Sequence, residues 1–331
     1  MTRVGLVLGA GGVVGQAYHA GVLAALEHDL GWDPRTADII VGSSAGSVTG
    51  TLLRLGVPAT DLAAWAAEAP LSVLSREGKL VLEELGGETP EFPPLELGDV
   101  LRWWRMPSAA LVTRTLRRPW AFRPGAAAAT LLPSGRINIL EHAHALEEML
   151  DGDWPPGLWI CTARRSDGGR VVFGRPGAPD AGLPEAVAAS CAIPGYFAPI
   201  RINGVEYFDG GVYSPSNADV LRREDLDLVI VVSPMSAVRG RSRGVDAMWR
   251  RSVHRRLSRE VATLRAAGMT VVRFEPGRRT LPAMGLNAMS VDRSDAVVQR
   301  SFIEAGKAAA YPKSAAALAA IATRSSRRIS A

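Results

Sequence analysis

The five residues Gly42-Ser43-Ser44-Ala45-Gly46 have the spacing of a nucleophile elbow, a sharp turn with a serine at its centre. An apolar run that predicts a buried strand ends at Gly42, and a helical pattern begins at Ala45. In such a turn the serine backbone is strained, and side chains two positions before or after the serine would collide. The hydroxyl would stand beside a helix N-terminus, whose free N–H groups favour negative charge. We predict that Ser44 is a catalytic nucleophile and that Gly42 and Gly46 are structural residues of its turn.

A serine hydroxyl needs a base to become nucleophilic at neutral pH. Asp209 ends a strand-like run, and Gly210 and Gly211 then turn the chain away, so that its carboxylate could face the elbow. An ordinary Asp-Gly turn explains the same residues, and spacing alone leaves the two interpretations open. Of the five histidines, only His254 follows in the chain order Ser…Asp…His, but arginines flank it and would disfavour an imidazolium. We interpret His254 as a surface histidine.

The loop from Gly9 to Gly15 follows a predicted strand and opens a helix, as a dinucleotide fingerprint would. The third glycine of that fingerprint is missing, because Val14 stands at its position. The acidic residue expected after the second strand is missing as well, since Gly42-Ser43 occupies that place. Two interpretations remain. The backbone N–H groups form an oxyanion hole for acyl transfer, or the glycines only allow tight packing of strand and helix.

Four blocks, in this order, resemble the patatin-like phospholipase family. They are the glycine-rich stretch 9–23, the elbow 42–46, the segment 189–199 (Ala-Ser-Cys-Ala-Ile-Pro-Gly-Tyr-Phe-Ala-Pro) and Asp209-Gly210-Gly211 with Asn217 downstream. Together they span residues 4–217. The resemblance implies a three-layer α/β/α fold and a catalytic dyad without histidine. In that dyad Ser44 attacks an acyl ester and Asp209 takes the proton.

The resemblance also assigns the glycine-rich loop to the oxyanion hole. Gly11 and Gly12 would contribute donors, and Ala10 and Val13 lie in the same loop, with Gly9 and Gly15 as structural residues. Many family members carry Arg or Lys where Val14 stands. The missing cation removes one argument for a strong preference for phosphate-bearing lipids.

The hydrophobic pattern predicts the elements that position these residues. Strands at 3–8 and 38–41 alternate with helices at 14–28 and 45–55, which predicts a mainly parallel sheet flanked by helices. Asp-Gly and Asn-Gly turns predict two hairpins, 158–163 with 170–173 and 200–202 with 206–208. Further strands are expected at 226–232 and 270–274, and helices at 184–190, 246–267 and 295–323.

We expect one catalytic domain over residues 1–324, followed by a disordered polar tail at 325–331. Residues 58–150 show no strand signal and are interrupted by prolines, tryptophans and arginines, which predicts a helical cap inserted over the sheet. The Trp- and Arg-rich stretches 102–106 and 117–122 fit a membrane interface, and ordinary packing of the cap explains the tryptophans equally well.

Composition limits the class of protein. The 331 residues are 47% apolar and 21% charged, as in a globular domain, and no apolar run approaches the ~18 residues of a membrane span. Cys161 and Cys191 lie in apolar patterns and predict buried thiols, which fits a reducing, cytoplasmic location. The net charge of +5 favours anionic surfaces. We interpret the Arg-rich stretch 239–259 as a solvated helix face and expect no nucleic-acid partner.

These observations predict a serine lipid acyl hydrolase that cleaves a lipid or fatty-acyl ester through an acyl-Ser44 intermediate, without metal or cofactor. An acyltransferase with the same dyad is the nearest alternative. A non-catalytic lipid-binding scaffold and a nucleotide-binding protein are further alternatives.

Overall fold

The computed structural model describes residues 2–85, 106–119, 122–140, 143, 146, 153–238 and 246–328. Within these residues the strands form one eight-stranded sheet, in the order β5-β6-β3-β2-β1-β7-β8 with β4 also paired to β3. The strands are β1 (Val4–Leu8), β2 (Ile39–Ser43), β3 (Leu158–Arg164), β4 (Arg170–Phe173), β5 (Ile200–Ile202), β6 (Val205–Asp209), β7 (Leu228–Val232) and β8 (Thr270–Phe274). The neighbouring strands β3, β2, β1, β7 and β8 are parallel to one another. Strands β4 and β6 both pair with β3 in the antiparallel direction. The predicted mainly parallel sheet is confirmed.

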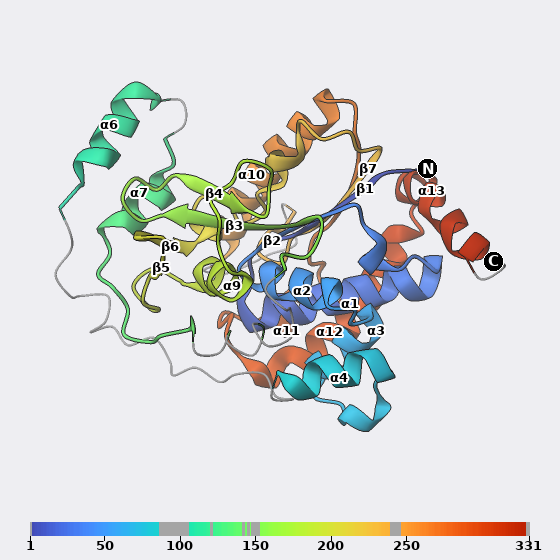
Figure 1. The fold of residues 1–331 in the computed structure, drawn as a ribbon. Helices are drawn as coiled ribbons and strands as arrows, with labels where there is room; N and C mark the ends of the chain where they lie inside the picture. Colours follow the sequence, from blue (N-terminus) through green and yellow to red (C-terminus); the bar gives the residue numbers. More distant parts are fainter. Residues whose placement is uncertain are drawn as a thin grey trace.

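Helices cover both faces of this sheet (Figure 1). One face carries α1 (Gly12–Leu30), α2 (Ala45–Arg54), α9 (Leu183–Cys191) and α12 (Ser294–Ala309), and the other face carries α10 (Ala247–Ala266). Side chains of β1 alternate between the two cores, because Leu6 and Leu8 pack on the α1 side and Val7 on the α10 side. The fold is therefore a three-layer α/β/α arrangement, as the sequence predicts.

Helix α1 is the central helix of its layer. From Val13 to Leu26 almost every residue is buried, because α2, α3 (Ala59–Ala66) and α12 all contact it. A helix that is apolar on all sides has to be surrounded in this way. Its N-terminus is thereby fixed at the end of β1, next to the elbow that opens α2.

The C-terminal region differs from the prediction. A single helix over 295–323 is wrong, since α12 ends at Ala309 and α13 (Pro312–Arg328) begins anew. Pro312 lacks an N–H and cannot continue a helix, but it is well placed in a first turn. Helix α13 runs to Arg328, beyond the predicted start of the disordered tail at 325, and residues 329–331 lie outside the described part.

The described parts of the predicted cap, 58–150, contain helices and no strand. They are α3, α4 (Arg76–Glu84), α6 (Ala109–Arg117) and α7 (Pro124–Leu131). Helix α3 packs on α1 and α12, so this end of the insertion joins the main helical layer. The Trp- and Arg-rich residues 102–105 and Trp120 lie outside the described residues. In the described chain, no helix combines the length and apolarity needed to cross a bilayer.

Candidate active site

Ser44 stands between β2 and α2 with φ 52° and ψ −125°, in a region that L-residues other than glycine rarely adopt. A Cβ at Gly42 would lie 2.5 Å from the Gly46 oxygen, and one at Gly46 would lie 1.9 Å from the Leu8 oxygen. Neither position has room for a side chain, so the turn can be this sharp only with glycine at both places. The strained serine backbone and the tight flanking residues are the features expected of a nucleophile elbow.

Strand register brings Ser44 and Asp209 together. Ser43, at the end of β2, pairs with Cys161 of β3, and Asp209, at the end of β6, pairs with the next residue, Thr162. Because β4 occupies the opposite side of Thr162, β6 lies on the same side of β3 as β2. The antiparallel β6 and the parallel β2 therefore approach each other end to end along β3. Their terminal residues, far apart in sequence, meet at one point of the sheet.

The Asp209 carboxyl is buried at this meeting point. Its Oδ1 accepts the Gly211 N–H at 2.6 Å. Burial raises the pKa of Asp209 from 3.8 to about 6, while the Gly211 N–H and the neighbouring Ser44 side chain act in the opposite direction. A carboxylate with this pKa is ionised at neutral pH and is a stronger base than an exposed aspartate.

Asn217 ties the elbow to the aspartate turn. Its buried side-chain Nδ2 donates to Ser43 Oγ at 2.9 Å, to the Gly210 oxygen at 3.2 Å and to the Ser214 oxygen at 2.6 Å. Its Oδ1 accepts from Arg170 Nη1 at 3.1 Å. One amide therefore bonds to the residue before Ser44 and to the residue after Asp209. The sequence had shown Asn217 as part of the family pattern, without this role.

A second contact holds the elbow from the side. The Ser44 N–H donates to Ser190 Oγ at 2.9 Å, and Ser190 Oγ donates to the Cys161 oxygen at 2.8 Å. Ser190 lies in the 189–199 block of the family pattern, but nothing in its spacing pointed to the nucleophile. The resemblance of that block was the available signal.

Three N–H groups of the glycine-rich loop are free to bind an oxyanion. Within the described residues, the backbone N–H groups of Gly11, Gly12 and Val13 have no acceptor. Gly12 has φ +62° and, with Val13, lines the same cavity as Ser44. These groups lie at the N-terminus of α1, where orphan donors and the helix dipole favour negative charge.

The backbone N–H groups of Gly9 and Ala10, at the start of the same loop, have acceptors within the fold. The Ala10 N–H donates to the Pro215 oxygen at 2.7 Å, and the Gly9 N–H donates to the Val232 oxygen at 2.9 Å. Both N–H groups are already bonded to backbone oxygens, so Ala10 lies in the loop without a free N–H of its own. Other glycines of the site stand where neighbouring atoms leave no room for a Cβ. A Cβ at Gly11 would lie 2.6 Å from Gly15 Cα, one at Gly210 would lie 2.2 Å from the Cys161 oxygen, and one at Gly211 would lie 2.9 Å from Ala10 Cβ.

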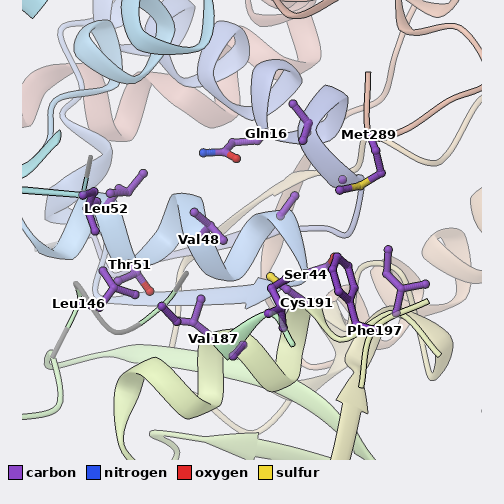
Figure 2. Close-up of a pocket in the computed structure, with 18 of the residues that line it drawn as sticks. Gln16, Ser44, Val48, Thr51, Leu52, Leu146, Val187, Cys191, Phe197 and Met289 are labelled. Carbon is purple, nitrogen blue, oxygen red and sulfur yellow. The ribbon is translucent and has the colours of Figure 1, made fainter. Parts of the chain in front are cut away.

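A cavity of about 160 Å³ opens beside Ser44. In Figure 2, Val48, Thr51 and Leu52 follow along α2 away from Ser44, and Phe197 and Met289 lie on its other side. The opposite walls come from α1, α9 and the segments that carry Phe197 and Met289. Most of the lining side chains are apolar, which suits a hydrocarbon chain. Val14, which stands where the family pattern has Arg or Lys, is buried in α1, and the described residues that line the cavity include no Arg or Lys.

The histidines of the described chain do not complete a triad. His254 Nδ1 lies 2.6 Å from Glu275 Oε2, on the α10 side of the sheet. His19 is buried in α1, where its Nδ1 lies 3.3 Å from Thr49 Oγ1. Burial lowers the pKa of His19 to about 3, partly opposed by the Gly9 carbonyl, so its imidazole is neutral.

Both cysteines are free thiols. Cys191 lines the cavity, and burial raises its pKa to about 12, which makes it a poor nucleophile. Throughout the described ranges, no three His, Cys, Asp or Glu residues gather in a group that could hold a metal ion.

A mainly parallel sheet between two helical layers, with a strained serine beside a buried aspartate, defines an α/β protein that carries a nucleophile elbow. The sequence model of the patatin-like phospholipases matches residues 6–222, more than half of the chain. The chain therefore belongs to the patatin-like phospholipase family, whose members are lipid acyl hydrolases.

The crystal structure of VipD from Legionella pneumophila is a structural neighbour at 13% identity and a TM-score of 0.44, covering 93% of this chain and 67% of that chain. No match was found among curated proteins.

Proposed function

We propose that the protein hydrolyses carboxylic esters of lipids with Ser44 as nucleophile and Asp209 as general base. The observation that carries this proposal is the end-to-end approach of β2 and β6, which sets a strained serine beside a buried carboxyl whose pKa is raised to about 6. Membership of a family of lipid acyl hydrolases supports the same chemistry.

In the first half-reaction, Ser44 Oγ attacks the ester carbonyl carbon while its proton passes to Asp209. The carbonyl oxygen becomes an oxyanion, which the free N–H groups of Gly11, Gly12 and Val13 stabilise. As the C–O bond to the alcohol breaks, protonated Asp209 returns its proton to the leaving oxygen. The acyl group is then an ester of Ser44.

In the second half-reaction, ionised Asp209 takes a proton from a water molecule as that water attacks the acyl carbon. The same N–H groups stabilise the second oxyanion. As it collapses, the bond between the acyl carbon and Ser44 Oγ breaks and protonated Asp209 returns its proton to Oγ, which releases the fatty acid and restores the Ser44 hydroxyl. Asp209 serves both half-reactions by alternating between its ionised and its protonated form. A pKa near 6 suits this double role better than the 3.8 of an exposed aspartate.

The cavity supplies the binding site for the acyl chain in this proposal. From Ser44 it follows α2 past Val48 to Leu52, two turns along the helix. Apolar walls on α9 and α1 complete it. Burial of each methylene contributes about 0.8 kcal/mol, so chains that fill the cavity should react faster than short ones.

Hydrolysis of p-nitrophenyl esters of increasing chain length tests the proposal, with wild type and the variants Ser44→Ala, Asp209→Asn and His254→Ala. We expect Ser44→Ala to be inactive and Asp209→Asn to lose about 10²–10⁴-fold in rate. His254→Ala is the matched control, and it should retain wild-type activity because His254 bonds to Glu275 instead.

Loss of activity in a folded His254→Ala variant would overturn the dyad in favour of a triad. Full activity in Ser44→Ala would overturn the nucleophile. Adding an alcohol to the wild-type assay separates the two fates of the acyl-enzyme. Hydrolysis predicts free fatty acid as the main product, whereas an ester of the added alcohol would show an acyltransferase.

A further inference from the structure

Helix α6 projects from the body of the molecule (Figure 1) and buries none of its nine residues. A helix this short is marginally stable alone in water, where helices below about 12–15 residues hardly form. Leu111, Arg114 and Thr115 line a small hollow shared with α7 and the turn after β3, and two side-chain hydrogen bonds connect the segment to that turn. Ser108 Oγ donates to the Ser166 oxygen, and Arg114 Nη1 donates to Asp167 Oδ2 at 3.3 Å.

Several large apolar side chains of α6 and its flanks are exposed. Val112 is 47% exposed and Leu116, one turn further along the same side of the helix, is 77% exposed. Met106 before the helix is 88% exposed, and Phe122 after it is 44% exposed. Four large apolar side chains in one short segment are more than the scattered exposure normal for a protein surface.

The same segment is basic. Arg117 and Arg118 are exposed, and within the described residues neither forms an ion pair. Arg114 is the third arginine of the segment and is bound to Asp167. A helix with an apolar side and unpaired arginines has the composition of helices that lie in the interface of an anionic membrane.

Strand register places this segment at the catalytic end of the sheet. Ser43 pairs with Cys161, and β3 continues three residues further to Arg164. The turn that follows, which carries Ser166 and Asp167, therefore lies beyond the end of β2, on the side where Ser44 stands. Since α6 is bonded to this turn, it lies at the same end of the molecule.

We propose that Met106, Val112, Leu116 and Phe122, together with Arg117 and Arg118, form a surface that docks on an anionic phospholipid bilayer. We name it the α6 surface. Its apolar side chains enter the interface and its arginines contact lipid phosphates, as the net charge of +5 favours. Docking presents the catalytic end of the sheet to the lipid. The proposal rests on the proposed function only in that a membrane ester is the substrate.

Co-sedimentation with vesicles tests the α6 surface. The vesicles are phosphatidylcholine alone, or phosphatidylcholine mixed with phosphatidylglycerol. The variants are Leu116→Asp and the double variant Arg117→Gln/Arg118→Gln. Leu80→Asp is the matched control, because Leu80 is 60% exposed on α4, at the opposite end of the molecule in Figure 1.

Wild type should bind the mixed vesicles more tightly than phosphatidylcholine. Leu116→Asp should weaken binding to the mixed vesicles at least tenfold. Removing both arginines should weaken it by about fivefold for each charge and abolish the preference for phosphatidylglycerol. Leu80→Asp should bind like wild type. All variants should hydrolyse a soluble p-nitrophenyl ester at the wild-type rate, which separates failure of docking from failure of the proposed chemistry.

Equal binding by Leu116→Asp and Leu80→Asp would overturn the proposal. Sedimentation velocity provides the second measurement. If wild type self-associates in the absence of vesicles and Leu116→Asp is a monomer, a second copy covers the α6 surface and the membrane assignment is wrong.

Discussion

Asp209→Asn replaces a carboxyl whose ionisation the fold opposes. Burial raises the pKa of Asp209 from 3.8 to about 6, so the folded protein holds this proton more tightly than the unfolded chain does. At 1.36 kcal/mol for each pKa unit, the ionised carboxylate destabilises the folded state by about 3 kcal/mol. This effect is absent below about pH 4, grows as the pH rises between the two pKa values, and is complete above about pH 6.

Asparagine keeps the shape of the side chain and an oxygen that can accept the Gly211 N–H, now 2.6 Å from Oδ1. It carries no charge to desolvate. We therefore expect Asp209→Asn to raise the free energy of unfolding by about 1–3 kcal/mol at pH 8, while hydrolysis falls by the two to four orders of magnitude due to a general base. At about pH 4 the gain in stability should shrink below ~1 kcal/mol, because both side chains are then neutral in the fold.

Urea unfolding of wild type and Asp209→Asn at both pH values measures this difference. Asp225→Asn is the control, because the Asp225 side chain is 97% exposed and its change should stay within about 0.5 kcal/mol at either pH. A destabilised Asp209→Asn at pH 8, or a gain that persists unchanged at pH 4, would refute the assignment of a buried carboxylate with a raised pKa.

Three further predictions concern the same site. The rate of ester hydrolysis should rise with pH through a midpoint near 6, because Asp209 acts as a base only when ionised; a pH–rate profile without an acid limb would contradict this. Asn217→Ala should lower the free energy of unfolding by about 1–3 kcal/mol and reduce activity, because the buried Ser43 hydroxyl and Gly210 oxygen lose their hydrogen-bond partner. Urea denaturation and an activity assay measure the two effects, and unchanged stability together with unchanged activity would contradict this role of the amide. Gly12→Ala should cost about 10²–10³ in rate, because a Cβ there would lie 2.6 Å from the Ala288 oxygen and displace the free N–H groups; an unchanged kcat would exclude Gly12 as part of an oxyanion hole.

Much of the framework could be predicted because its causes are local. The apolar runs ending at Leu8 and Gly42 predict adjacent parallel strands, and the glycines at 42 and 46 predict the turn between β2 and α2. These features depend on sterics and side-chain period within a few residues. The Asp-Gly and Asn-Gly turns predict their hairpins for the same reason.

The features that complete the site depend on contacts across the fold. The end-to-end approach of β2 and β6 is set by pairing with β3, more than a hundred residues from the elbow, and no local pattern encodes that register. Ser190 and the Asn217 amide have their roles because the register brings them to the elbow. The satisfied N–H of Ala10 follows from the path of Pro215 beside the loop. Pro312 by itself predicts a break in the helix, whereas the alanine-rich pattern around it predicts one continuous helix. The structure follows the proline.

Rapid-quench mass spectrometry during turnover of a p-nitrophenyl ester tests the central claim most directly. The account predicts one acyl group on the protein, located on the peptide that contains Ser44 and absent from Ser44→Ala. An acyl group on a residue other than Ser44 would contradict the account. So would turnover by wild type in which samples quenched before deacylation carry no acyl group on the protein.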